Sequence, residues 1–274
     1  MLKTVIHNVP FYRFSGLGSY YRIEHFISTR KGGVSGGGQA SLNMGFMEAD
    51  APGNVLANRR LLLSEMDIPL ESVVFGEQRH TTNVAVVGKG EAGRGAKEKS
   101  SRLPETDALI TAVPGICLVV LAADCVPILL YDTECHVVAA VHAGWRGTVG
   151  QIVRKVVERM VGEFGCRPRD FRAGIGPAIG PCCYEVGEEV WEKVRTVSED
   201  LAGVVTPGRG KGKYFLDLWE ANRRQLLDVG LYSGQIEVAG VCTACHHDEF
   251  YSYRASGGDT GRFAAGIMLR TEQR

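Results

Sequence analysis

Short apolar runs bounded by turn-forming residues alternate along the chain with longer segments of helical periodicity. Short runs rich in β-branched and large apolar residues are typical of buried strands. They occupy residues 73–75, 107–110, 116–121, 137–141, 235–241 and 264–269. Apolar residues spaced three or four positions apart predict amphipathic helices. Such spacing occurs in residues 54–66, 148–164, 185–197 and 218–229.

The interleaving of predicted strands and helices favours a mixed α/β (α+β) fold, in which helices cover a central mixed sheet. The chain of 274 residues can bury one large core or two small ones, and no shift in composition marks a linker. We therefore expect one domain over residues 1–274. Residues 30–38 hold many glycines and predict a loop, and residues 88–104 predict a mobile excursion.

Composition narrows the function classes. Hydrophobic residues make up 45% of the chain, charged residues 23%, and the formal net charge is zero. This balance is typical of a globular protein and gives no electrostatic reason to expect a nucleic acid or membrane partner. No apolar run is long enough for a membrane span, and the N-terminal residues lack the pattern of a signal peptide. We expect a cytoplasmic protein whose eight cysteines are reduced.

Chemically reactive side chains lie at the ends of three apolar runs. His80 ends GEQRH (76–80), Cys125 lies within ADCVP (123–127) and His142 begins HAGWRG (142–147). Two histidines and one cysteine make a three-ligand set, the number that leaves a catalytic zinc ion one open position. Spacing alone equally allows a core cysteine and two hydrogen-bonded histidines. Asp124 is a candidate base or ligand-orienting carboxylate, and Arg146 offers a planar fork for a phosphate or carboxylate.

A second cysteine motif, CTACHH (242–247), combines C-x-x-C spacing with two histidines. Alone it resembles half of a structural zinc site. Cys182 and Cys183 do not offer a second pair of similar spacing, since adjacent side chains on an extended chain point in different directions. We therefore expect a turn at residues 242–247, and an accessory metal there stays open.

Several loops carry polar residues or glycines near the motifs. Residues 174–181 form a glycine-rich loop that matches no nucleotide-binding fingerprint and is predicted to shape a pocket wall. Arg30, Asn43, Arg254 and Arg262 lie in loops next to glycine or aromatic residues. Taken singly, each is expected to be a surface residue.

Taken together, these motifs resemble the YfiH-type family, which has long been labelled multicopper polyphenol oxidoreductases or laccase-domain proteins. The resemblance covers nearly the whole chain. It is carried by STRKGGVS (28–35), SLN (41–43), QRH (78–80), ADCVP (123–127), HAGWRG (142–147), CCYEV (182–186), SYR (252–254) and TGR (260–262). It implies a layered α/β sandwich, distinct from the cupredoxin domains of true laccases.

The resemblance also implies an activity. Members of this family are zinc-dependent purine nucleoside enzymes, which phosphorolyse adenosine, inosine, guanosine and S-methyl-5′-thioadenosine and also deaminate adenosine. The family's catalytic His, Cys and His correspond to His80, Cys125 and His142. The expected partners are purine nucleosides and phosphate, with Arg30 or Arg146 as the phosphate clamp and Asn43 as a further substrate-binding residue. The expected assembly is a monomer or a homodimer.

Copper is the alternative metal, because blue-copper sites also use two histidines and one cysteine. A four-copper laccase, however, needs more histidine ligands than the seven histidines of this chain, two of which, His7 and His25, lie away from every motif. We therefore expect one zinc ion. Cu²⁺ is the other expected occupant, because it ranks highest in the order of affinities of divalent metal ions for such ligands. A copper-dependent polyphenol oxidase and a non-catalytic metal-binding protein are the rival functions.

Deamination needs a group that carries a proton at the reacting centre. Zinc deaminases of the cytidine type use the Glu of an H-x-E motif together with P-C-x-x-C. Neither His80 nor His142 has a Glu two positions later, and the P-C-x-x-C motif is absent. Asp124, which precedes the predicted ligand Cys125, is our candidate for this role.

Overall fold

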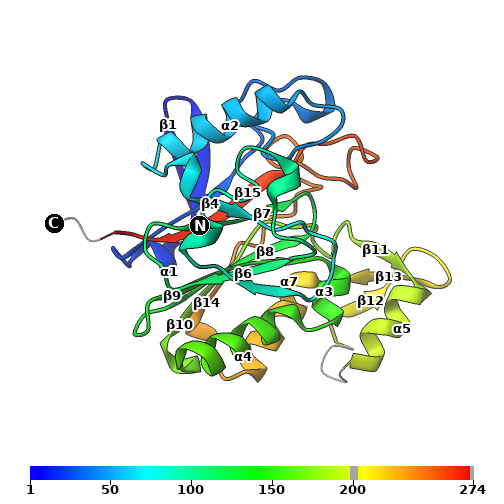
Figure 1. Cartoon of the computed structure of the whole chain (residues 1–274). Coiled ribbons are helices and arrows are strands. Elements are labelled where there is room, and N and C mark those ends of the chain that lie inside the picture. The colour runs from blue at the N-terminus through cyan, green and yellow to red at the C-terminus, as the bar shows by residue number, and fades with distance from the viewer. Residues whose placement is uncertain (198–202, 272–274) are drawn as a thin grey trace.

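Two six-stranded sheets lie face to face in the computed structural model, which describes residues 1–197 and 203–271 (Figure 1). The first sheet has the order β1 (Leu2–Ile6), β2 (Val9–Arg13), β3 (Ile23–Ser28), β15 (Phe263–Leu269), β7 (Cys117–Ala122) and β4 (Val73–Phe75). The second has the order β14 (Ile236–Val238), β10 (Phe171–Ile175), β8 (Val126–Asp132), β9 (Val137–Ala143), β6 (Ala108–Thr111) and β5 (Val84–Val86). Both sheets are mixed, since β4 pairs with β7 and β10 with β14 in parallel while most other pairs are antiparallel.

Helices cover the outer faces of the sheets. The α-helices are α1 (Ser15–Gly18), α2 (Pro52–Ser64), α3 (Trp145–Val149), α4 (Ile152–Phe164), α5 (Glu188–Val197) and α7 (Leu218–Asp228). Figure 1 shows α2 outside the first sheet and α4 outside the second. A small third sheet of β11 (Glu185–Gly187), β13 (Lys213–Leu216) and β12 (Val205–Pro207) lies beside α5. Short 3₁₀ helices span Gly37–Gln39, Leu70–Ser72, Lys89–Glu91, Lys99–Ser101, Pro168–Asp170 and Ser233–Gln235.

The alternating direction of side chains along each strand explains this layered arrangement. In β7, Leu118 and Val120 belong to the apolar cluster between the sheets, whereas Val119 and Leu121 belong to the cluster beneath α2. Successive side chains of a strand point to opposite faces, so a strand that is apolar at every position must be covered on both sides. The layered α+β fold is therefore confirmed, but two facing sheets take the place of the one central sheet that we expected.

Several element boundaries differ from the prediction. The segment 148–164 is divided into α3 and α4, because Gln151 adopts a left-handed conformation (φ 59°) between them. The segment 185–197 begins as strand β11 before α5 starts, and the strand expected at 235–241 is confined to β14. None of the described helices has both the length and the apolar character that a membrane span requires.

We expected residues 88–104 to be a mobile excursion. The segment does lie outside the sheets, but it is packed against the core. The buried side chain of Arg59 donates from Nη1 to the carbonyls of Gly95 and Ala96, both at 2.7 Å. Ala96 and Leu103 are themselves buried. The polar composition of residues 88–104 indicates a segment outside the sheets. It does not reveal that the buried Arg59 holds the segment in place through hydrogen bonds.

Candidate active site

The topology brings three strand ends to one edge of the sandwich. Strand β4 runs parallel to β7, so the loops that carry His80 and Cys125 leave the first sheet at the same edge. Cys125 lies where the chain crosses from β7 to β8 in the second sheet. Because β9 is antiparallel to β8, with Pro127 opposite His142, the end of β9 returns to this crossing. The three predicted ligands therefore meet where the two sheets adjoin.

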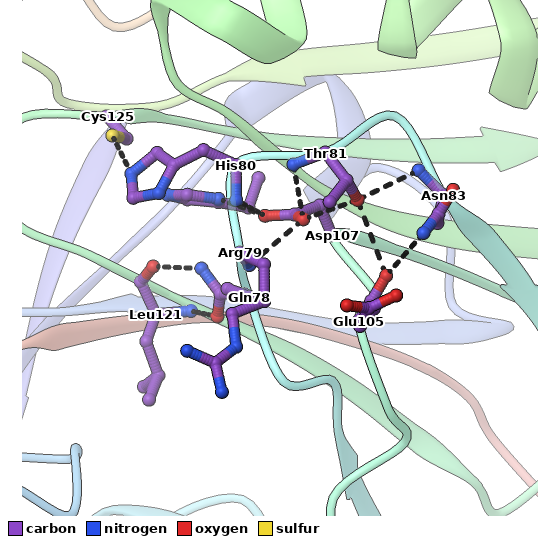
Figure 2. A network of polar contacts seen from close by, with 10 residues as sticks. Gln78, Arg79, His80, Thr81, Asn83, Glu105, Asp107, Leu121 and Cys125 are labelled. Atoms are coloured by element: carbon purple, nitrogen blue, oxygen red, sulfur yellow. Dashed lines mark hydrogen bonds and ion pairs between the residues drawn. The ribbon is translucent and has the colours of Figure 1, made fainter.

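Their donor atoms form one compact group. The Nε2 atom of His80 lies 3.7 Å from the Sγ atom of Cys125, and the rings of His80 and His142 are 5.1 Å apart between centroids. One donor atom from each of the three residues lies within 4.8 Å of the others. Figure 2 shows the His80 ring directed toward Cys125. The convergence that spacing alone left open is present in the structure.

Asp107, at the start of β6, organises two of the three ligands. Its carboxylate accepts a hydrogen bond from Nδ1 of His142 at 2.9 Å, which leaves Nε2 of that ring as the remaining donor atom. It also accepts hydrogen bonds from the backbone N–H groups of Arg79, His80 and Thr81 at 2.8–3.1 Å (Figure 2). A carboxylate behind a ligating histidine fixes the tautomer and orientation of the ring. Asp107 was not predicted as a site residue, because its role depends on the pairing of β6 with β9, which brings it to His142.

The electrostatics of the group favour the thiolate form of Cys125 and the protonated form of His142, so a metal ion that binds His142 must displace a proton. Burial opposes ionisation of Asp107, but hydrogen bonds and charge from His142 lower the pKa of Asp107 to about 2. Desolvation likewise opposes ionisation of the Cys125 thiol, yet the charges and hydrogen bonds of His142 and His80 lower its pKa to about 6. Burial opposes protonation of His142, but Cys125 and Asp107 raise its pKa to about 9. Cys125 is therefore a thiolate at neutral pH, the form in which cysteine binds metals.

Two backbone features support this geometry. His80 (φ 59°) and Asp124 (φ 88°) both occupy the left-handed region, which costs on the order of 1–3 kcal/mol for a residue other than glycine. Gly144 leaves the space that the ligands need, since a Cβ atom there would lie 2.9 Å from His80 Cδ2 and 3.0 Å from Cys125 Sγ. The donor set, its supporting carboxylate and this cleared space fit a zinc or copper ion with two nitrogen ligands and one sulfur ligand.

A pocket of about 620 Å³ opens onto the three ligands. This volume is within the range of small-molecule sites. Its walls combine aromatic rings with guanidinium groups and one carboxylate. The ring-bearing and charged residues that line it, besides the ligands, are Phe46, Arg102, Asp124, Trp145, Tyr184, Tyr253, Arg254 and Arg262. A ligand with a flat ring and an anionic part would find both kinds of partner here.

The comparisons with known proteins agree with this architecture. The family model for multi-copper polyphenol oxidoreductase laccase matches residues 24–270. The chain belongs to this laccase-domain family. It is 43% identical over 256 residues to a protein of Bacteroides thetaiotaomicron named purine nucleoside phosphorylase. The aligned region covers 93% of this chain and 95% of that protein. It is 36% identical over 245 residues to adenosine deaminase RL5 of an unknown prokaryotic organism, covering 89% and 93% of the two chains.

A solved structure shows the same fold. The crystal structure of the hypothetical protein YfiH of Bacillus licheniformis matches with a TM-score of 0.91 and 33% identity over 97% of both chains. The resemblance to the YfiH-type family is thus confirmed, and with it the layered fold. The family is named for copper proteins, and this chain has groups of His and Cys side chains that could hold a metal ion.

The predicted arginines of this laccase-domain protein lie at different places relative to the pocket. Arg146 is exposed on α3, with its guanidinium 4.3 Å from the ring centroid of the pocket residue Trp145. Arg30 is not among the pocket-lining residues, because its guanidinium donates to the carbonyls of Ala40 and His247 at 2.7–3.0 Å. Neither Arg146 nor Arg30 lines the pocket, but Arg146 lies against the pocket residue Trp145.

Asn43 is wholly buried rather than on the surface. Its side-chain amide donates to the carbonyl of Gly45 at 2.9 Å and to Asp50 at 2.7 Å. Its Oδ1 atom accepts hydrogen bonds from the backbone N–H groups of Gly45 and Arg262 at 3.0 and 2.9 Å. Asn43 therefore holds two residues that line the pocket, and has no exposed surface of its own for a substrate.

Two arginines expected on the surface prove to be pocket residues, and a third was not recognised. Arg262 is half-buried, and Arg254 and Arg262 both line the pocket. Arg102 also lines it, and its Nε and Nη2 atoms are buried without a hydrogen-bond partner in the part of the chain that the structure describes. Sequence gives little sign of such a residue, because Arg102 lies in the polar segment 88–104 far from every motif.

Asp124 lines the pocket beside the ligand Cys125. Its Oδ1 atom accepts a hydrogen bond from the Thr243 hydroxyl at 2.6 Å, and its Oδ2 atom accepts one from the backbone N–H of Arg254 at 2.7 Å. The carboxylate thus fastens two loops to the site. Each oxygen keeps a further lone pair, since a carboxylate offers about four acceptor positions.

The interpretation of the C-terminal cysteines was wrong in part. Residues 243–249 do form turns, as expected. Cys182 and Cys183, however, lie in a turn rather than on an extended strand, and both side chains meet the pair of the C-x-x-C motif. The chain is not extended here because the backbone N–H groups of Cys183 and Tyr184 both donate to the carbonyl of Gly180, which closes that turn.

Proposed function

We propose that this protein is a zinc-dependent purine nucleoside phosphorylase. Its substrates are adenosine, inosine, guanosine and S-methyl-5′-thioadenosine, and its second substrate is phosphate. The names of its relatives support the reaction class, since the Bacteroides protein at 43% identity is named purine nucleoside phosphorylase. The observation that carries the proposal is the pocket itself, in which a His–Cys–His group, aromatic rings and arginines line one space.

In the proposed reaction a phosphate oxygen forms a bond to C1′ as the bond from C1′ to the purine nitrogen breaks. The proton of the phosphate ends on the leaving base, and the products are the free purine and ribose 1-phosphate, or 5-methylthioribose 1-phosphate from S-methyl-5′-thioadenosine. Positive charge develops on the sugar ring while negative charge develops on the base. The protein must therefore hold an anion beneath C1′ and stabilise the departing base.

The pocket residues divide between these tasks. We assign phosphate binding to Arg262. Its Nη1 atom donates to the carbonyls of Thr260 and Gly261, and these hydrogen bonds hold the guanidinium in place. The Nε and Nη2 atoms are the two further donor atoms that can bind a phosphate in parallel. Arg146, which lies against Trp145, supplements the positive charge. The rings of Trp145 and Tyr184 would flank the purine, since both line the pocket next to the ligand group.

His80, Cys125 and His142 would hold zinc, and zinc when bound supplies Lewis-acid chemistry to the pocket. Zinc suits the site better than several coppers do. Among the residues that the structure describes, only one potential metal group contains histidine. A copper-dependent polyphenol oxidase would need further histidine ligands to assemble a multicopper centre.

We propose adenosine deamination as a second activity, which the name of the relative adenosine deaminase RL5 supports. Asp124 is the acid–base group in this proposal. Its carboxylate lines the pocket next to Cys125, and its unused lone pairs can accept a proton from an attacking water and return it to the leaving ammonia. Its two hydrogen bonds from Thr243 and Arg254 hold it in place.

The test is to incubate the purified protein with adenosine, with and without phosphate, and to separate the products by chromatography. Adenine and ribose 1-phosphate should form only with phosphate, whereas inosine should form in both samples. Oxygen uptake with phenolic substrates would instead support the polyphenol oxidase. A zinc-loaded protein that converts no nucleoside would support a non-catalytic metal-binding function and overturn the proposal.

A further inference from the structure

Four cysteines that the proposed activity does not use lie together on the far side of the pocket wall. Cys182 and Cys183 belong to the turn before β11, and Cys242 and Cys245 to the turn after β14. Their four sulfur atoms lie within 4.8 Å of one another. Cys245 is 3.6 Å from Cys182 and 3.4 Å from Cys183, although more than 60 residues separate the two turns.

These separations fit four thiolates around one metal ion. Zinc–sulfur bonds of about 2.3 Å in tetrahedral geometry place neighbouring sulfur atoms about 3.8 Å apart. A disulfide needs about 2.05 Å, and all eight cysteines are free in the structure. An iron–sulfur cluster interposes several iron atoms between its cysteines and requires wider separations than these. The arrangement therefore matches a mononuclear tetrathiolate site.

The surroundings supply what a thiolate group needs. The backbone N–H of Gly180 donates to Cys242 Sγ at 3.2 Å, a hydrogen bond of the kind that stabilises a metal-bound thiolate. Arg209, Arg254 and Glu185 line the depression beside the cluster, so the two arginines leave one net positive charge to offset the negative charge of four thiolates on a divalent ion. His246 and His247 are exposed and are not members of the four-donor group.

We propose that Cys182, Cys183, Cys242 and Cys245 bind one structural zinc ion, separate from the ion at His80, Cys125 and His142. Four protein ligands close the coordination sphere, which is the mark of a structural rather than a catalytic zinc site. This proposal rests on the thiol cluster alone and does not depend on the nucleoside activity.

The ion would fasten the active-site wall. Tyr184, which lines the pocket, directly follows Cys183. Thr243, between Cys242 and Cys245, donates to Asp124 at 2.6 Å. Arg254 donates from its backbone to Asp124 and from its guanidinium to the carbonyl of Cys183 at 3.3 Å. One ion would therefore join the two turns that hold this side of the pocket.

The test is to measure zinc per chain by mass spectrometry in protein purified under reducing conditions with zinc present. We expect two zinc ions in the wild type and one in Cys182→Ser, Cys245→Ser or Cys125→Ser. The control Cys117→Ala removes a buried thiol that belongs to none of the groups able to hold a metal ion, and it should retain two. Zinc content that is unchanged from wild type in Cys182→Ser and Cys245→Ser, or loss of an ion in Cys117→Ala, would overturn the proposal, as would a native mass that shows a disulfide among the four cysteines.

A second measurement covers the case in which the cluster variants do not fold. Cys125→Ser protein reconstituted with Co²⁺ should show the intense sulfur-to-metal charge-transfer absorption of a tetrathiolate centre. Absence of this absorption in folded Cys125→Ser protein would contradict the proposal. If Cys125→Ser protein shows the band but converts no nucleoside, the structural site stands whatever the outcome for the proposed enzyme.

Discussion

The Nδ1 atom of His142 lies 2.9 Å from the Oδ1 atom of Asp107, and both side chains are buried. The same carboxylate accepts hydrogen bonds from the backbone of the loop that carries His80. Asp107, which directly precedes β6 of the second sheet, thus orients His142 of that sheet and the loop with His80 that leaves the first sheet. This link explains how strand ends from two sheets bring the three candidate ligands together.

Asp107→Asn should therefore weaken metal binding without removing a ligand. An amide cannot accept all of these hydrogen bonds, and its NH₂ group offers a donor where His142 needs an acceptor. We expect zinc affinity to fall about 10- to 100-fold, as for other partners of metal-binding histidines. Competition with a chelating dye measures this. The control is Glu105→Gln, an exposed acid on the same segment; equal affinities in the two variants would contradict the role of Asp107.

Gly144→Ala should disrupt the centre by crowding. The added methyl group would lie within 3.0 Å of both His80 and Cys125, and the ligands would have to move apart. We expect loss of zinc at this site and of nucleoside cleavage in a folded protein. Gly162→Ala, where nothing lies within 4 Å of the added atom, is the matched control. Normal zinc content and activity in Gly144→Ala would show that the space is not needed.

Arg262→Lys should raise the KM for phosphate by about tenfold, because an ammonium group cannot make the two parallel hydrogen bonds of a guanidinium. The KM for the nucleoside should change far less. Arg30→Lys serves as the comparison, since the Arg30 guanidinium contacts backbone carbonyls outside the pocket. Initial rates at varied phosphate concentration decide between the two. A larger effect from Arg30→Lys would return the phosphate clamp to Arg30.

Asp124→Asn should abolish inosine formation from adenosine while zinc stays bound and phosphorolysis persists. The matched variant is Thr243→Val, which removes the hydrogen bond to Asp124 but leaves the carboxylate. If Asp124 carries the proton, Thr243→Val keeps deaminase activity and Asp124→Asn does not. Full deamination by Asp124→Asn would show that another group carries the proton.

His25 should make folding stability depend on pH. Burial, together with the charge of Arg13, lowers the pKa of His25 from 6.5 to about 4. Between these values the unfolded chain binds a proton that the folded chain does not, so stability is full above pH 6.5 and falls as the pH drops toward 4. The loss is about 3 kcal/mol over this window. Urea unfolding of wild type and His25→Gln tests this; the variant should show a shallower pH dependence, and identical slopes would contradict it.

The three candidate ligands could be predicted because each stands at the end of an apolar strand. A reactive side chain at such a position is held by a rigid element, and the sequence displays both features together. Asp107 and Arg102 could not be recognised in the same way. The role of each depends on which strand or loop lies opposite, and that follows from sheet pairing over long distances in the chain.

The cysteine cluster shows that local backbone conformation also limits prediction from the sequence. Its two pairs were visible in the sequence, but the geometry assumed for Cys182 and Cys183 was an extended chain. The turn closed by Gly180 changes the direction of both side chains, and such local backbone detail decides whether adjacent cysteines can share one ion. Similarly, continuous apolar spacing concealed the break between α3 and α4, because it does not record the left-handed Gln151.

The most direct test of the account is ³¹P nuclear magnetic resonance of zinc-loaded protein with inosine and inorganic phosphate. We predict that the ribose 1-phosphate signal grows as inorganic phosphate declines, with one hypoxanthine released for each phosphate consumed. Cys125→Ser protein should give no such signal. Hypoxanthine that appears without ribose 1-phosphate, or no cleavage by fully zinc-loaded wild type, would contradict the proposed phosphorolysis.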